Sequence, residues 1–223
     1  MEKKKPRLVA IFAHPDDEAF GPSGTLALYA KTHDVYIICA TRGEAGKNHD
    51  VESQHKTIGD IREAELRASA KIIGTKEVIM LGFEDGMLSN NLYHEIADKI
   101  LKHLEELRPE ILMTYELHGI SGHIDHVVMA MVSSYLFDHT TYTKKLMYHC
   151  LDVKEQESIG DYFIFVPPGY TAEEINEKVD VSSVWDLKVK AIKTHVSQAK
   201  DGNSILEEMK DLPQIENFLI KEK

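Results

Sequence analysis

The sequence predicts an α/β fold: a Rossmann-like, mostly parallel sheet with helices on both faces. Two observations lead to this prediction. Apolar runs of four to six residues alternate with longer segments whose apolar residues have helical spacing, a pattern typical of βαβ units. The chain of 223 residues, 43% of them hydrophobic, is long enough for one domain with a sizeable core. We therefore expect a single domain over residues 1–223.

The first half of the chain carries the clearest elements. Thr57–Ile73 has helical periodicity and Gly74 as a natural stop, and Leu92–Leu107 repeats this pattern and ends before Pro109. The predicted strands are Leu8–Ala13, Val35–Ala40, Val78–Leu81 and Ile111–Tyr115.

The pattern weakens from about Lys144 onward. We interpret this part as an extension of the same domain, because no linker or repeat separates it. Its predicted elements are strands at Leu146–Leu151 and Tyr162–Val166, a turn at Pro167–Gly169 and a helix at Trp185–His195.

Composition excludes several classes of partner. The formal net charge of -11 opposes binding to nucleic acid or to an anionic membrane surface. No apolar stretch has the length of a membrane span or of a secretory signal, and Cys39 and Cys150 are expected to be buried, reduced thiols, so we expect a cytoplasmic protein. No dinucleotide fingerprint or phosphate-binding loop is present, so a nucleotide cofactor is not indicated. The oligomeric state stays open, and a homo-oligomer is compatible with the sequence.

Residues suited to chemistry follow the predicted strands. Parallel sheets bind ligands beyond the carboxyl ends of their strands, so the segments just after the strands are the place to look. Most of the candidate His, Asp and Gly residues lie there, in His14–Glu18, Thr41–Gly46, Gly82–Met87 and Glu116–His126.

The first cluster is His14-Pro15-Asp16-Asp17-Glu18, which places a nitrogen ligand and three carboxylates directly after a buried strand. Like charges so close together favour a bound cation. The alternative is a solvated acidic turn shaped by Pro15. The position at a strand end favours the metal.

The second cluster, residues 118–126, holds three histidines and one aspartate before an apolar helical run. His14, Asp17 and His126 could supply two nitrogens and one oxygen to zinc, with the fourth position open for water. An open position is typical of a catalytic metal rather than a structural one.

Together the two clusters resemble the PIG-L/LmbE-like family of zinc-dependent N-acetylglucosaminyl deacetylases, which includes the bacillithiol- and mycothiol-type enzymes that act on GlcNAc conjugates. The family hallmarks are a His-Pro-Asp-Asp-Glu-type motif after the first strand and a later His-x-Asp-His motif, here His123-Ile124-Asp125-His126. The resemblance extends to Thr41–Gly46, Arg62–Leu66, Leu81–Gly86 and Lys190–Gln198.

The resemblance implies a role for each motif residue. It makes His14, Asp17 and His126 the metal ligands and Asp16 the general base that acts on the attacking water. His123, in its protonated form, would stabilise the oxyanion, and Asp125 would orient a neighbouring histidine. The expected cofactor is Zn²⁺, with Fe²⁺ as an alternative, because sites of two histidines and one carboxylate accept both.

The resemblance also implies three substrate-binding residues, Glu44, Arg62 and Asp85, which would contact the sugar. Each has an alternative interpretation. Arg62 could be a charge on a helix surface, the stretch that contains Asp85 can be aligned one residue differently, and the position of Glu44 between two glycines is equally ambiguous.

Two departures from the family pattern stand out. Some relatives carry Tyr where this chain has Ser121, so this chain either uses another group to assist the oxyanion, such as Tyr115 or His118, or does without one. Ile124 replaces the usual Pro, which changes only local stiffness.

Near the C-terminus, His195 and Gln198 either pack at the rim of the site or reflect a helix end, where a histidine is favourable against the dipole.

The implied activity is hydrolysis of the acetamide of a small, GlcNAc-containing molecule. Two alternatives stay open: an amidase that acts on another amide conjugate, such as a thiol adduct, and a non-catalytic module that binds metal or sugar. Retention of Asp16 and His123, which mere binding would not need, argues against the module.

Overall fold

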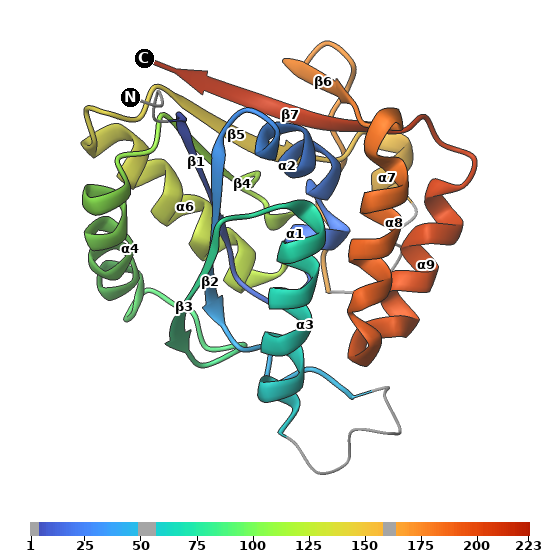
Figure 1. Cartoon of the computed structure of the whole chain (residues 1–223), viewed down its shortest axis with the longest axis horizontal. Coiled ribbons are helices and arrows are strands. Elements are labelled where there is room, and N and C mark those ends of the chain that lie inside the picture. The colour runs from blue at the N-terminus through green and yellow to red at the C-terminus, as the bar shows by residue number, and fades with distance from the viewer. Residues whose placement is uncertain (1–4, 49–56, 158–163) are drawn as a thin grey trace.

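The computed structural model describes residues 5–48, 57–157 and 164–223. Within these residues seven strands form one sheet in the order β3-β2-β1-β4-β5-β7-β6 (Figure 1). The strands are β1 (Arg7–Phe12), β2 (Asp34–Thr41), β3 (Glu77–Phe83), β4 (Ile111–Tyr115), β5 (Lys145–Cys150), β6 (Glu177–Asp180) and β7 (Ile215–Glu222). The pairings among β1 to β5 are parallel, whereas β7 pairs antiparallel with both β5 and β6.

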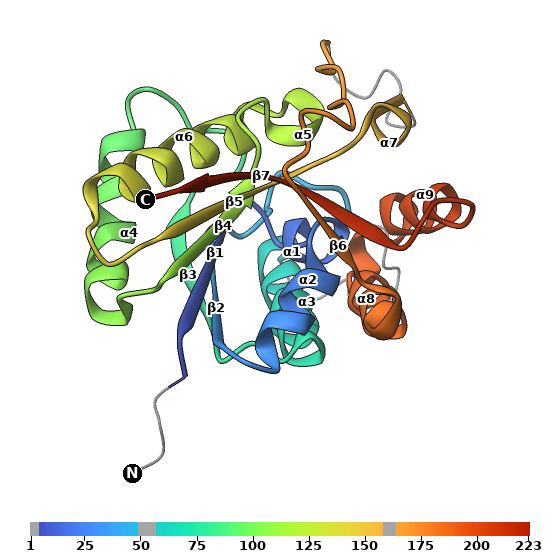
Figure 2. The same cartoon turned by 90° about the horizontal axis from the view of Figure 1, so that it is seen from above.

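Helices cover both faces of the sheet, with α4 and α6 on one face and α2, α3 and α8 on the other (Figures 1 and 2). The helices are α1 (Asp17–Phe20), α2 (Ser23–Ala30), α3 (Ile58–Ile73), α4 (Tyr93–Leu107), α5 (Gly119–Gly122), α6 (Ile124–His139), α7 (Val153–Glu157), α8 (Trp185–Thr194) and α9 (Ala199–Met209). Two short 3₁₀ helices, η1 (Ser182–Val184) and η2 (Val196–Gln198), flank α8. The predicted Rossmann-like α/β fold is confirmed.

The central strand β1 shows why its sequence is apolar without alternation. Successive side chains of a strand point to opposite faces, and both faces of this sheet are covered. Val9 and Ile11 belong to the core cluster with α4 and α6, and Leu8, Ala10 and Phe12 to the cluster with α2, α3 and α8. All five side chains are at most 1% exposed.

Most predicted elements are confirmed to within one or two residues, including the helix before Gly74, where the backbone is left-handed. The strand predicted at Tyr162–Val166 is wrong where it can be compared. Residues 164–169 have no regular structure, and Tyr162 and Phe163 lie outside the described residues. Ile164 and Phe165 are exposed, and the two prolines that follow cannot donate hydrogen bonds to a ladder. The turn predicted at Pro167–Gly169 is likewise not formed.

The sequence did not reveal β6, β7 or α9, which complete the extension. Strand β7 runs beside β5 along most of its length, from Lys145 paired with Glu222 to Cys150 paired with Asn217. Cys39 and Cys150 are buried and free, as predicted. Among the described helices, none combines the length and apolar character needed to cross a membrane.

The order of the strands creates a switch point beside β1. After β1 the chain builds β2 and β3 on one side, and then returns to place β4 and β5 on the other. Ligands in such sheets bind in the crevice beyond the carboxyl ends of the two strands at this point. The first motif follows β1 and the second follows β4, so the topology brings them together.

Candidate metal centre

Three predicted ligands converge at this crevice. Nδ1 of His14 and Nε2 of His126 lie 3.1 Å apart, and Oδ1 of Asp17 lies 3.1 Å from the same nitrogen of His126. Two ligand atoms bound tetrahedrally at zinc distances are about 3.3 Å apart. The nearest contact between His14 and Asp17 is 3.7 Å, from Nδ1 to the other carboxylate oxygen, Oδ2. The three side chains thus gather around Nε2 of His126, and their binding of one ion stays a prediction.

The carboxylate of Asp17 is fixed by the backbone. Its Oδ2 accepts the N–H groups of Ala13 at 3.1 Å and His14 at 2.8 Å. Burial acts to raise the pKa of Asp17, but the charge of His126 and the hydrogen bond from it outweigh burial, and the pKa is lowered. The group is therefore an anion whose direction is set before any ligand binds.

His123 lies close enough to be a geometric alternative to Asp17. Ligand nitrogens of His14, His123 and His126 lie within 4.8 Å of one another, and the ring of His123 stacks on that of His126 at 4.9 Å. The carboxylate of Asp17 contacts His126 directly, at 3.1 Å through Oδ1. We retain the set of His14, Asp17 and His126 as the ligand prediction, with His123 at its edge.

The second ring nitrogen of each candidate histidine ligand has its own acceptor. Nε2 of His14 lies 3.0 Å from Oδ1 of Asp85 and 3.3 Å from Oδ2 of Asp125, and Nδ1 of His126 lies 3.1 Å from the carbonyl oxygen of Gly119. Such partners fix the tautomer and orientation of metal-binding histidines.

The carboxylates also raise the pKa of His14. Burial acts to lower this pKa, but the hydrogen bonds of Asp125 and Asp85, together with the charge of Asp17, raise it to about 10. The cluster therefore binds a proton strongly, and a metal cation would take the place of that proton.

Asp125 joins this centre to the loop after β3. Its side chain is 1% exposed, and it accepts the backbone N–H groups of Gly86 at 2.8 Å and Leu88 at 3.2 Å. The contact with His14 supports the prediction that Asp125 orients a histidine.

Asp16, the predicted base, stands in an unusual backbone conformation with φ of 110°. It is one of three non-glycine residues with positive φ in the described part of the chain. Its Oδ2 accepts a hydrogen bond from Arg62 at 2.9 Å. Burial raises the pKa of Asp16 to about 6, against the opposing charge of Arg62. A carboxylate with a pKa near neutrality suits general-base catalysis.

The protonated state predicted for His123 stays a prediction, and its surroundings in this structure act against it. Burial, followed by the charges of His126 and His14, lowers the pKa of His123 to about 4. Its Nδ1 accepts the N–H of Asp125 at 3.1 Å and so caps helix α6. A neutral imidazole that accepts at Nδ1 carries its proton on Nε2.

The predicted sugar-binding residues lie beside the centre but have other contacts. Arg62 is 5% exposed and donates to the carbonyl oxygens of Gly43 at 2.7 Å and Pro15 at 2.8 Å. It is therefore not a charge on the helix surface. Asp85 accepts the N–H of Ala45 at 3.0 Å besides contacting His14, and Glu44, which is exposed, accepts the N–H of Asp85. Their contact with a sugar stays a prediction.

Tyr115 and His118, the two candidates to replace the missing Tyr, lie in different surroundings. Tyr115 is buried, and its hydroxyl donates to the carbonyl oxygen of Asp17 at 2.7 Å. His118 is exposed and stacks at 6.3 Å on Tyr170, whose hydroxyl donates to Glu116. Tyr115 thus holds the backbone of the segment that carries Asp17.

One set of contacts near the centre was missed from the sequence. Nε2 of His195 lies 2.8 Å from Oε1 of Glu18, and Ser197 donates to Glu65 through its N–H and its hydroxyl. Burial acts to lower the pKa of His195, but the charge of Glu18 outweighs it and the pKa is raised. The motif matches at Arg62–Leu66 and Lys190–Gln198 were the available signal, and they did not show that these segments touch.

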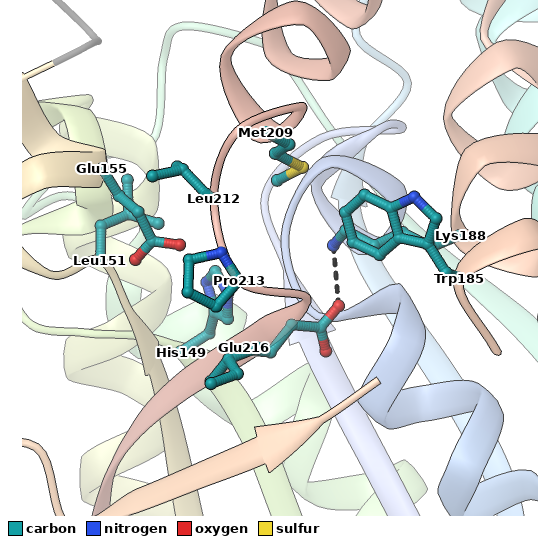
Figure 3. Close-up of a pocket in the computed structure, with 10 residues that line it drawn as sticks. His149, Leu151, Glu155, Trp185, Lys188, Met209, Leu212, Pro213 and Glu216 are labelled. Atoms are coloured by element: carbon teal, nitrogen blue, oxygen red, sulfur yellow. Dashed lines mark hydrogen bonds and ion pairs between the residues drawn. The ribbon is translucent and has the colours of Figure 1, made fainter. Parts of the chain in front are cut away.

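A second buried charged group lies apart from the metal cluster, beside the pocket drawn in Figure 3. Lys188 on α8 pairs with Glu216 on β7 at 2.7 Å and also donates to the carbonyl oxygen of Gly21. Glu216 in turn accepts the N–H groups of Gly24 and Thr25 at the start of α2. No lining residue of this pocket belongs to the metal cluster.

Fold and site together define an α/β protein with a candidate metal centre at the switch point of its sheet. Residues 9–136 match the model of the family described as PIG-L, GlcNAc-PI de-N-acetylase. The match covers more than half of the chain, so the chain belongs to the PIG-L family.

Relatives within the family carry deacetylase names. A Catenulispora acidiphila protein named 1D-myo-inositol 2-acetamido-2-deoxy-alpha-D-glucopyranoside deacetylase 3 is 33% identical over an alignment of 147 positions, which covers 54% of this chain but only 41% of that protein. A Bacillus cereus protein named probable N-acetyl-alpha-D-glucosaminyl L-malate deacetylase 2 is 29% identical over 199 residues, covering 86% of this chain and 84% of its own length.

Solved structures share the fold. The N,N'-diacetylchitobiose deacetylase from Pyrococcus horikoshii superposes with a TM-score of 0.70 and 23% identity, covering 98% of this chain and 84% of that one. At this identity the likeness speaks for the fold alone.

Proposed function

We propose that this protein is a zinc-dependent hydrolase that removes the acetyl group from a small molecule containing N-acetylglucosamine. One observation carries the proposal. Nε2 of His126 lies 3.1 Å both from a nitrogen of His14 and from a carboxylate oxygen of Asp17, and burial raises the pKa of the neighbouring Asp16 to about 6. In a PIG-L family member, a hydrolytic metal centre accounts for this arrangement.

Different residues would have separate roles in the reaction. His14, Asp17 and His126 would hold the ion, which when bound polarises the acetamide carbonyl and lowers the pKa of a water molecule. Asp16 takes the proton of the attacking water and returns it to the departing amine nitrogen. His123 would donate a hydrogen bond from its imidazole to the oxyanion. No side chain of the protein becomes acylated.

The part of the substrate that we propose is the sugar; the group attached to it stays open. The names of the relatives share an N-acetylated glucosamine but differ in the group attached to it, inositol or malate. Glu44, Arg62 and Asp85 border the metal cluster and are proposed to orient the sugar. Two buried free thiols fit a cytoplasmic location, which is part of the proposal.

The test is a substrate screen on the zinc-loaded protein. Release of free amine is measured from GlcNAc-malate, GlcNAc-inositol and diacetylchitobiose, with an N-acetylated amino acid as control and Fe²⁺-loaded protein in parallel. We expect at least one GlcNAc conjugate to be hydrolysed with a higher kcat/KM than the control. A higher kcat/KM for the control would point to an amidase for other conjugates, and metal and sugar binding without turnover would point to a binding module.

A further inference from the structure

A buried line of hydrogen bonds reaches Asp16 from the other end of the chain. Nε2 of His195 lies 2.8 Å from Oε1 of Glu18, and Oε2 of Glu18 accepts the backbone N–H of Asp16 at 3.1 Å. Glu18 is 0% exposed and His195 is 1% exposed. These two residues are 177 positions apart in the sequence, so only the fold brings them together.

The hydrogen bond from the backbone N–H of Asp16 to Glu18 lies at a residue whose backbone conformation is energetically unfavourable. A φ of 110° with ψ of -27° is a conformation that a residue with a Cβ atom adopts only when its surroundings impose it. The carbonyl oxygen of Asp16 accepts the N–H groups of Ala19 and Phe20, which begins α1. With the N–H held by Glu18 as well, both backbone polar groups of Asp16 are fixed.

Helix α3 contacts both the side chain of Asp16 and the segment that carries His195. Arg62 on α3 donates to the carboxylate of Asp16 at 2.9 Å. Three residues further along the same helix face, Glu65 accepts the N–H of Ser197 at 2.8 Å and its hydroxyl at 2.6 Å. The segment that carries His195 is therefore anchored to the helix that also orients the side chain of Asp16.

We propose that His195 is a positioning residue of the deacetylation site: through Glu18 it holds the backbone of Asp16 so that the carboxylate of Asp16 is aimed at the reacting centre. The inference rests on the proposed function in which Asp16 is the base. His195 itself touches neither substrate nor metal ligand in this role.

Simple filling of the core would be the competing explanation, since the ring of His195 also packs edge-on against Phe20 at 5.9 Å. Filling alone needs only the volume of the side chain, whereas positioning needs the N–H at Nε2. The two explanations therefore differ for variants that keep the volume but change the donor.

The experiment compares His195→Met, which removes the donor at similar size, with His195→Gln, whose amide N–H reaches about as far as Nε2. The matched control is His149→Met, which makes the same change at a buried histidine, 5% exposed, that lines the pocket of Figure 3. We expect His195→Met to lower kcat about 10- to 100-fold with KM within about twofold and zinc content unchanged. His195→Gln should restore most of kcat, and His149→Met should keep it.

A double-mutant cycle tests whether the effect passes through Asp16. Once Asp16→Asn has removed the base, adding His195→Met should lower kcat by less than about twofold. Additive losses would overturn the proposal, as would equal losses in His195→Met and His195→Gln. If His195→Met does not fold, Glu18→Gln, which removes one acceptor oxygen at unchanged volume, takes its place with the same expected fall in kcat.

A structural measurement separates this proposal from the proposed function. In the crystal structure of zinc-loaded His195→Met, φ of Asp16 should leave the left-handed region, or its carboxylate should turn away from Arg62. An unchanged Asp16 would overturn the positioning role even if the enzyme is a deacetylase. A displaced Asp16 in a protein inactive on every GlcNAc conjugate would support positioning and reject the proposed substrate.

Discussion

Two buried groups of charges in this protein differ in how they are balanced. At the pocket of Figure 3, Lys188 pairs with Glu216 and also donates to the carbonyl oxygen of Gly21, and both carboxylate oxygens of Glu216 accept backbone N–H groups, from Gly24 and Thr25. At the candidate metal centre, four aspartates lie around Arg62 and the histidines; they are Asp16, Asp17, Asp85 and Asp125.

This difference distinguishes an ion pair that stabilises the fold from a cluster suited to binding a cation. A buried ion pair that serves the fold is complete without a ligand, because any uncompensated charge in the interior destabilises the native state. The metal centre has more carboxylates than fixed cations, and its histidine nitrogens face one another at 3.1 Å. Such an arrangement is stable when a cation, either protons or a metal, joins it.

The largest expected effect is the loss of the metal. His126→Ala should lose most of the bound zinc and reduce deacetylation to background, because it removes one of three ligands. Metal analysis and activity before and after chelation measure this, and added zinc should restore only the wild type. Zinc bound by His126→Ala with unchanged affinity would contradict the ligand assignment.

Within the metal centre, the adjacent aspartates should separate into base and ligand. Asp16→Asn should lower kcat by about 10²–10⁴ with zinc still bound, because a positioned general base contributes about that factor. Asp17→Asn should instead weaken zinc binding, which competition with a chelator measures. Near-wild-type kcat in Asp16→Asn with metal bound would assign the proton transfer to another group, with Glu18 the first to test.

At the balanced pair, the expected effect is on stability. Lys188→Met should lower the free energy of unfolding by about 3 kcal/mol, because it leaves Glu216 buried without its cation. The double change Lys188→Met with Glu216→Leu should recover part of this loss. Urea unfolding measures both, and zinc content per folded chain should stay constant. A change below about 0.5 kcal/mol would mean that the backbone contacts of Glu216 suffice.

The smallest expected effect is the pH dependence from His149 beside the same pair. Burial lowers the pKa of His149 to about 4 from 6.5, so the native state excludes a proton that the unfolded chain binds. Its contribution to stability is therefore complete above pH 6.5 and is lost as the pH falls towards 4.

Urea unfolding of metal-free protein at pH 6.5 and 5.5 measures this contribution. The wild type should lose about 1 kcal/mol more than His149→Met over this one pH unit. The metal centre is the same in both proteins, so its own titration cancels. Equal losses would show that His149 is protonated in the native state.

The sequence by itself determined the parallel strands and the location of the site. Runs such as Leu8–Ala13 are apolar on both faces because both faces are covered, and parallel strands direct the residues that follow them to one edge. The residue types in His14–Glu18 and His123–His126 then sufficed to predict a metal site there.

Only the tertiary structure decided which residues touch. The antiparallel strands β6 and β7 depend on pairing with segments distant in the sequence, and β6 is only four residues long. Likewise, Glu18 meets His195 and Lys188 meets Glu216 across long sequence separations. Side-chain partners of buried charges depend on packing between helices, which local sequence patterns do not encode, and this is why the supports of Asp16 could be found only in the folded chain.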